Sequence, residues 1–553
     1  MGCMMLHRRH AWLVGLILFE LAGAALVLRW LFAPVPVIAP GALTPVAAPP
    51  ATIALPPELP AGMRTVIDRW AAAYSYVAYS GRGEPDLHLA WRKSPGARLV
   101  GEWVLVPAAA FPSLRRDVQD QDLHDMWLGP AGAESETARL VVTADVAAIL
   151  DGLWGQRGSE ALVSVVASGE IVDRVWARNE NGGYGDTAIV AFHHLDPRLS
   201  PLAVDGVSAL DPDLDLAGYS LVARLWAAGP RPDVDSLAAS LVEAGVSTNR
   251  HPGRLTELIV TGVTALTRGV AVQIESRGEP AWPARGGADL LASADVTHVS
   301  NEVSFVPGCE ADPETTAFCA RPEYLDALRL AGVDVVELTG NHNLDLGAAP
   351  ARASLDLYQE AGMHVFGGGE DQAAAHRPLI VEHNGNRAGF LGYNAFGPHY
   401  AWAGVSAPGA ARFSLDAVAH DVALARPHAG LLIVTMQYTE TYDTMPLPRQ
   451  VVDFRSVADA GADVVIGTQA HQPQAIEFYR GKPIFYGLGN LFFDQTWSEP
   501  TCQSLVVRLT LHDGRLLAAQ LIPTTMGIDC QPYVAPTARR DAILRTVFEA
   551  SGW

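Results

Sequence analysis

The stretch AGVDVVELTGNHNLDLG (331–347) contains an apolar run and the polar residues that follow it. Residues 333–338 are rich in Val, which is typical of a strand buried on both faces. The run ends near Gly340, and Asn341, His342 and Asp345 come soon afterwards. Open α/β sheets place functional side chains at the carboxyl ends of their strands. The stretch therefore predicts a buried strand that delivers polar groups to one edge of a sheet.

The same pattern recurs on both sides of this stretch. Further strands are expected at 257–262, 296–305, 387–393, 431–438 and 462–469, with helices at 323–331, 348–361 and 448–460 between several of them. Two hairpins follow, with turns at Arg480-Gly481 and Asp513-Gly514,. The order indicates a domain over 255–530 with mixed sheets and outer helices, followed by a tail at 531–553 with a short terminal helix.

Polar side chains gather where five of these strands end. A single His or Asn at such a place is usually a turn residue, but five successive clusters favour a site. Carboxylate, amide and imidazole groups are what a divalent ion needs to polarise phosphate or to generate hydroxide. The residues are Asn301, Glu302, Asn341, His342, Asp345, Gln437, Glu440, Gln469, His471 and Asn490.

A family resemblance rests on these residues and on the segments that join them. It is carried by TGVTALTRGV (261–270), ADVTHVSNEVSF (294–305), the opening stretch, GMHVFGGGEDQAAAHRP (362–378) and AGADVVIGTQAHQPQAIEFYRGKPIFYGLGNLFFDQ (460–495). In order and spacing, residues 255–525 resemble the CapA capsule-synthesis branch of the calcineurin-like metallophosphoesterases. The resemblance implies a pair of β-sheets packed face to face and flanked by helices. It also implies a role outside the membrane in making a capsule or exopolymer such as poly-γ-glutamate.

The family's metal ligands are only partly present. The Asp that ends the family's first strand is here Val263, and two of its His ligands are replaced by Gln437 and Gln469. Val cannot bind a cation, and a neutral amide is a poor substitute for imidazole, so a two-metal site is not expected. The remaining set of Glu302, Asn341, His342 and His471 supplies four ligands for a single ion,.

Three interpretations of the site stay open. In the first, one divalent ion is kept and a phosphoester is hydrolysed with His342 near the leaving group. In the second, no metal is bound, and Glu302 or Asp345 acts as general acid or base with His342 and His471. In the third, the site binds without catalysis. Its ligand is then an anionic cell-surface polymer or a small anion, contacted by Asn301, Gln437, Glu440, Gln469 and Asn490.

The N-terminal half predicts a separate α/β domain over 58–250. Apolar runs at 103–111, 139–146, 161–168 and 187–195 alternate with helical patterns at 141–155 and 233–244, which favours a largely parallel sheet,. Residues 106–129, 188–206 and 218–227 resemble a periplasmic substrate-binding protein of the phosphate-binding kind. Such domains clamp an anion with helix N-termini, and Ser113 and Arg115 lie where a helix is expected to begin. A docking domain without a ligand is the alternative.

The first residues predict export. Basic residues precede an apolar run at 11–28, and a Pro/Ala-rich linker spans 34–57,. Residues 1–33 are either an uncleaved single-pass anchor or a signal peptide. Both interpretations place the bulk of the chain outside the cell membrane, with Cys3 on the cytoplasmic side in the anchored form.

Charge and cysteines restrict the partners and the compartment. The formal net charge of −21 argues against nucleic acid, because neutralising phosphates requires clustered Lys and Arg,. Four cysteines remain outside the membrane. The expected pairs are Cys309 with Cys319 and Cys502 with Cys530, since each pair brackets a short loop or hairpin. Free buried thiols are the alternative.

Overall fold

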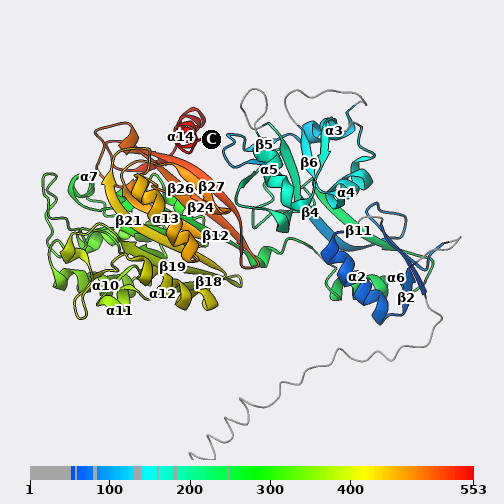
Figure 1. The fold of residues 1–553 in the computed structure, drawn as a ribbon, viewed down its shortest axis with the longest axis horizontal. Helices are drawn as coiled ribbons and strands as arrows, with labels where there is room; N and C mark the ends of the chain where they lie inside the picture. The colour runs from blue at the N-terminus through cyan, green and yellow to red at the C-terminus, as the bar shows by residue number, and fades with distance from the viewer. Residues whose placement is uncertain are drawn as a thin grey trace, which may run out of the picture.

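The computed structural model describes residues 51–56, 59–78, 84–129, 139–158, 161–177, 185–246 and 248–553. The expected anchor at 1–33 and most of the linker lie outside these residues. Among the described helices, none combines the length and the apolar character needed to cross a bilayer. The chain forms two α/β domains that lie side by side (Figure 1).

The N-terminal domain is built on one sheet of mixed direction. Its strand order is β2-β1-β3-β11-β4-β8-β6-β7, with β9 paired to β4. The pairs β11–β3, β11–β4, β4–β8 and β4–β9 are antiparallel, so the prediction of a largely parallel sheet was wrong. The strands are β1 (Ala51–Ala54), β2 (Tyr76–Ala78), β3 (Leu87–Ala90), β4 (Arg98–Ala110), β6 (Leu140–Val142), β7 (Val163–Val165), β8 (Thr187–Ala191), β9 (Leu199–Pro201) and β11 (Val222–Ala228), with the separate pair β5 (Asp117–Val118) and β10 (Ala203–Val204).

Two sequence predictions for this domain need correction. Strand β1 lies within the expected linker and pairs with β2 and β3, so the domain includes residues that were assigned to a spacer. Residues 113–116 are irregular rather than the start of a helix. The helices are α2 (Ala61–Ala73), α3 (Asp120–Leu128), α4 (Ala144–Trp154), α5 (Ile171–Trp176) and α6 (Val234–Glu243), the last of which confirms the predicted helix at 233–244.

The C-terminal domain contains two large sheets and the separate antiparallel pair β17–β20. The first has the order β16-β15-β14-β12-β26-β27-β28, with β13 joining β14 to β25, and the second has the order β18-β19-β21-β22-β24-β23. The strands are β12 (Leu255–Val260), β13 (Val263–Thr264), β14 (Val296–Asn301), β15 (Val335–Glu337), β16 (His364–Phe366), β17 (Gly368–Gly369), β18 (Leu379–His383), β19 (Asn386–Asn394), β20 (Gly409–Ala410), β21 (Leu431–Thr441), β22 (Val464–Ala470), β23 (Ile476–Tyr479), β24 (Lys482–Phe485), β25 (Asn490–Phe492), β26 (Gln503–His512), β27 (Arg515–Met526) and β28 (Pro532–Val534).

A continuous apolar layer joins the faces of these two sheets. Leu258 and Val507 of the first sheet share one buried cluster with Phe390, Ile433 and Phe485 of the second. Both predicted hairpins form, β23–β24 and β26–β27. Their turn residues have positive φ, as a two-residue hairpin turn requires,.

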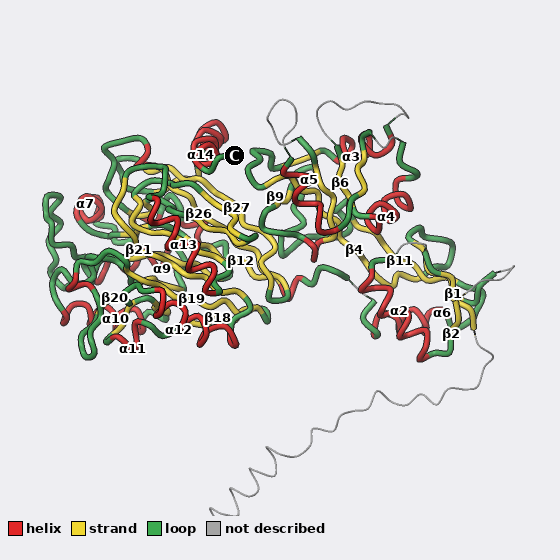
Figure 2. The backbone as a smooth tube through the Cα atoms, viewed as in Figure 1, coloured by secondary structure: helices red, strands yellow, loops and turns green. Residues whose placement is uncertain are grey.

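Helices cover the outer faces, and in Figure 2 they lie around the strands. Helices α7 (Arg268–Arg277), α9 (Leu325–Leu330) and α10 (Ala348–Glu360) pack on the first sheet. Helices α12 (Leu415–Ala425) and α13 (Pro448–Ala460) pack on the second. The short helices α8 (Ala288–Leu291) and α11 (Gln372–Ala375) complete the set with α14 (Thr537–Ala550). Because α14 contributes to the inter-sheet core, the domain extends beyond residue 530.

The two domains meet near β27 and at an aromatic cluster around Trp553. Strand β9 of the N-terminal domain contacts β27. The indole of Trp553 lies 5.3 Å from that of Trp176 and 5.8 Å from the ring of Phe111, both in the N-terminal domain. It also lies 5.9 Å from the ring of Phe478 and 6.0 Å from that of Phe548 in the C-terminal domain. The last residue of the sequence therefore contacts both cores.

Candidate functional site

The polar residues of the site lie at or just beyond the carboxyl ends of β14, β15, β21 and β22, and these strands run parallel within their sheets. Strand β14 pairs in parallel with β15, and β21 with β22, so their carboxyl ends lie on the same side. The Glu302 N–H donates to the Thr264 carbonyl of β13 at 3.0 Å, which joins the first of these ends to the neighbouring strand. A Cβ at Gly340 would lie only 2.3 Å from the Glu302 Cα, so the two strand ends touch through their backbones.

Glu302 is the buried carboxyl group of the site. Only 2 % of the residue is exposed, and its Oε2 has no hydrogen-bond partner in the part of the chain that the structure describes. Burial raises the pKa of Glu302 to about 7, against an opposing effect of His342. A carboxyl group without a partner is costly to ionise in such a place. Glu302 is therefore able to hold a proton near neutral pH.

His342 is held by two neighbours. Its Nδ1 hydrogen-bonds Asp345 Oδ2 at 2.6 Å, and its ring stacks on Phe318 at 3.9 Å. Burial alone would lower the pKa of His342, but the hydrogen bond to Asp345 and the charge of Glu302 outweigh burial and raise it. Asp345 is held in turn by the Phe318 N–H at 2.9 Å and the Tyr400 hydroxyl at 3.2 Å. These neighbours therefore shift His342 towards the imidazolium form.

His471 has the opposite tendency. Its Nδ1 hydrogen-bonds Asn490 Oδ1 at 2.7 Å, and its Nε2 lies 4.0 Å from Glu440 Oε1. Tyr442 stacks on the ring at 5.5 Å. Burial lowers the pKa of His471, although the hydrogen bond to Asn490 acts in the other direction. Two imidazoles of one site are thus biased towards different protonation states, which is an arrangement suited to acid–base chemistry.

An amide network occupies the middle of the site. The Gln437 Nε2 group donates to Asn341 Oδ1 at 2.8 Å and to Gln469 Oε1 at 3.1 Å. Gln469 has a φ of 74°, a left-handed conformation that costs a residue with a side chain about 1–2 kcal/mol,. Backbone strain of this kind gathers at functional sites. Gln437 and Gln469 thus lie in one network with Asn341, and their role in binding a ligand stays a prediction.

Asn301 does not join this cluster. Its Nδ2 donates to the Val303 carbonyl at 2.8 Å and to the Tyr358 hydroxyl at 2.6 Å, on the side of β14 that faces helix α10. Neighbouring residues of a strand point to opposite faces, so Asn301 and Glu302 separate. Asn301 is therefore a structural residue of the helix-covered core rather than a ligand-binding one.

Two residues of the site were missed by sequence reasoning. Arg268 pairs with Asp494 through Nη2 and Oδ1 at 2.5 Å, and its guanidinium lies 4.9 Å from the ring of Phe318. The ring of Phe318 in turn stacks on the imidazole of His342. The Phe318 loop is closed by the predicted disulfide between Cys309 and Cys319. The sequence feature that could have indicated Phe318 is its position between the two cysteines.

The second predicted disulfide is not formed. Cys502 and Cys530 are both free, and burial raises the pKa of each thiol. Both thiols thus stay protonated at neutral pH.

Comparison with known proteins bears on the same residues. The family described as "Bacterial capsule synthesis protein PGA_cap" matches residues 257–495. That segment contains all of the site described above. The match covers less than half of the chain.

Two curated relatives come from Bacillus. "Capsule biosynthesis protein CapA" of Bacillus anthracis is 30% identical over 208 residues, covering 37% of this chain and 50% of the relative. "PGA biosynthesis protein CapA" of Bacillus subtilis is 28% identical over 185 residues, covering 33% of this chain and 49% of the relative. The chain thus spans about half the length of these two capsule proteins.

Solved structures are only distantly similar. A phosphate transport receptor from Vibrio cholerae is 13% identical with a TM-score of 0.27, covering 35% of this chain and 98% of the receptor. A 5'-nucleotidase precursor from Thermus thermophilus is 13% identical with a TM-score of 0.31, covering 54% of this chain and 58% of that protein. Scores of this size carry no functional argument.

The capsule-family site of this chain does not fit two metal ions. Val263 has no donor atom at the bridging position, and Asn341 Oδ1 already accepts from Gln437. Within the described ranges, no group of three or more His, Cys, Asp or Glu residues is arranged to hold an ion. Among the described residues Glu302 Oε2 has no hydrogen-bond partner, and His342 and His471 use their Nδ1 atoms for Asp345 and Asn490, which leaves their Nε2 atoms as the nitrogen donors. They suit at most one ion, and that ion remains a prediction.

Proposed function

We propose that this protein acts in producing or retaining an anionic extracellular polymer of the poly-γ-glutamate type, and that the site around His342 binds a segment of that polymer. The names of the capsule-family relatives support the biological role. The observation that carries the binding role is His342 itself. Asp345 raises the pKa of His342, and 22% of the His342 side chain is exposed, so its imidazolium can pair with a carboxylate of the polymer without a metal.

Exposed aromatic rings beside the site support the same proposal. Tyr400, which holds Asp345, is 57% exposed, and Tyr442, which stacks on His471, is 46% exposed. Trp497 is 61% exposed and lies 5.9 Å from Tyr442. Rings held in this way offer apolar faces to the methylene groups of a chain, while His342 takes a carboxylate.

Binding of poly-γ-glutamate to the full chain by calorimetry tests this role. His342→Ala and Trp497→Ala should each weaken binding about tenfold, since each removes about 1.4 kcal/mol or more of contact energy. Tyr533→Ala, at an exposed tyrosine on β28, is the matched control and should bind normally. Binding should persist in a chelator and weaken with salt. Equal affinity in all variants would exclude this site, and no binding by the wild type would exclude the role.

A second function has its own support in Glu302. A buried carboxyl with a pKa of about 7 beside two imidazoles is suited to general acid catalysis without a metal,. In this function Glu302 holds the proton for the leaving group, His471 accepts the proton of the attacking water, and His342 orients the substrate. Incubation with the polymer should then release shorter chains, and Glu302→Gln should abolish the release. If the polymer stays intact with both proteins, only the binding function remains.

Metal analysis separates both functions from a one-ion hydrolase. The full chain, His342→Ala and His471→Ala are purified without chelator and analysed for bound divalent metal. One ion per wild-type chain that is lost in both variants would restore the single-ion interpretation. An equal trace in all three would remove it.

We also propose that the described domains lie outside the cytoplasm, with residues 1–33 as the membrane segment. The Cys309–Cys319 bond supports this, because disulfides persist in oxidising compartments,. Protease added to intact cells should digest the domains. Complete protection without lysis would contradict the location.

A further inference from the structure

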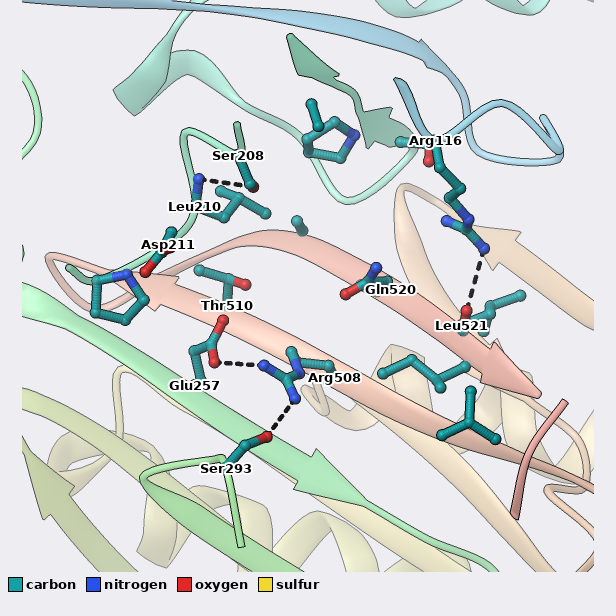
Figure 3. Close-up of a pocket in the computed structure, with 18 of the residues that line it drawn as sticks. Arg116, Ser208, Leu210, Asp211, Glu257, Ser293, Arg508, Thr510, Gln520 and Leu521 are labelled. Carbon is teal, nitrogen blue, oxygen red and sulfur yellow. Dashed lines mark hydrogen bonds and ion pairs between the residues drawn. The ribbon is translucent and has the colours of Figure 1, made fainter. Parts of the chain in front are cut away.

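A cleft of about 800 Å³ lies between the two domains, away from the site described above. Its floor is the outer face of β12, β26 and β27, which presents Glu257, Arg508, Thr510 and Gln520. Its roof comes from the N-terminal domain, through Arg116 and residues 208–213 (Figure 3). Its volume is in the range of ligand sites, which often form between domains.

Arg116 is the unpaired cation of this cleft. Within the described part of the chain, its guanidinium makes one hydrogen bond, from Nη2 to the Leu521 carbonyl at 3.1 Å. Its neighbour Arg540 already pairs with Asp541 at 2.6 Å. Burial lowers the pKa of Arg116 to about 10, and the like charge of Arg540 adds to this effect. Because Arg540 takes the Asp541 carboxylate, Arg116 has no ion-pair partner among the described residues,.

Arg508 brings a second unsatisfied donor to the floor. Its Nη1 pairs with Glu257 Oε2 at 2.7 Å and its Nη2 donates to Ser293 Oγ at 2.6 Å. Its Nε is buried and has no partner among the described residues. In Figure 3, Gln520 lies on the floor between Arg116 and Arg508, and Asp211 lies across the cleft from Arg116.

We propose that this cleft is a binding site for a small oxyanion, a carboxylate or phosphate group held by Arg116 with Gln520 beside it. A planar guanidinium with free N–H groups matches both groups in two-point geometry. Asp211, Asp213 and Asp295 also line the cleft and restrict the anion to the Arg116 end. The site uses residues of both domains, so an anion bound there holds the domains together. It does not depend on the capsule role.

Calorimetric titration of the full chain with inorganic phosphate, and separately with glutamate, tests the proposal. Saturable binding of either is expected, and the tighter one identifies the group. Arg116→Ala should weaken it at least about tenfold, and Arg116→Lys less, because Lys keeps the charge but loses the planar fork. Arg480→Ala, at an exposed arginine paired with Asp459, should bind as the wild type does.

Gln520 gives a test that does not disturb the buried groups, because its side chain is exposed. Gln520→Glu should weaken binding through repulsion, and Gln520→Lys should strengthen it. Absence of saturable binding by the wild type at about 10 mM of either anion, well beyond the millimolar range of weak sites, would overturn the proposal. Equal affinity across the Gln520 series would overturn it as well.

Discussion

Replacing Glu302 with Gln should stabilise the protein at pH 8 and hardly change it at pH 5. The pKa of Glu302 is about 7 in the folded chain, against an ordinary value of 4.5. At about 1.4 kcal/mol for each pH unit, this difference corresponds to about 3 kcal/mol. The carboxyl is fully buried, so solvent does not screen the effect.

The sign follows from proton binding. Between pH 4.5 and about 7 the unfolded chain releases this proton first, so the folded chain binds more protons,. The free energy of unfolding therefore falls as pH rises through this window and is level above it. Gln is neutral at every pH and replaces the protonated carboxyl, so Glu302→Gln should remove this fall.

Urea unfolding in chelator, at pH 5 and pH 8, measures the difference. The variant should exceed the wild type by about 3 kcal/mol at pH 8 and by less than about 1 kcal/mol at pH 5. Glu323→Gln, at an exposed glutamate, should show no such pH-dependent gain. A Glu302→Gln chain that is less stable at pH 8, or that gains equally at both pH values, would refute the reasoning. A bound ion would reverse the sign, which is why chelator is present.

Two further predictions concern the frame of the site. Gly340→Ala should destabilise the chain by about 1–3 kcal/mol in urea unfolding, because its Cβ would meet the Glu302 backbone at 2.3 Å,. Gly253→Ala, where nothing lies within 4 Å, should be neutral, and equal effects of both would contradict the contact. Replacing Cys309 and Cys319 together with Ser should cost about 3 kcal/mol, since the bond closes a loop of 10 residues,. The same double variant should also bind the polymer more weakly, because Phe318 lies in the loop that the disulfide closes. Unchanged melting and unchanged binding would contradict this prediction.

Much of the C-terminal domain could be predicted from the sequence, because its strands are short apolar runs and its hairpin turns contain residues that favour such turns. Arg480-Gly481 and Asp513-Gly514 both form hairpin turns with positive φ. The sheet of the N-terminal domain was harder to predict. Its strands β4 and β11 pair across more than a hundred residues, and the direction of that pairing leaves no local signal in the sequence. Strand β1 was assigned to a linker because the residues around it are rich in Pro.

The sequence indicated that Glu302 and His342 lie at neighbouring strand ends, and the role of these residues stays a prediction. Asn301 was misplaced, although a strict alternation from Glu302 would have put it on the other face. The pair of Arg268 and Asp494 was not predictable, because it joins a helix start to a loop 226 residues away. Whether Cys502 meets Cys530 likewise depends on tertiary distance, which hairpin spacing does not reveal.

The place of Trp553 has a practical consequence for handling the protein. Its indole packs among rings of both domains. A variant that lacks this side chain, such as Trp553→Ala, is therefore a poor choice for work that needs the two domains held in one arrangement. Small-angle scattering would record the loss of these contacts as a larger radius.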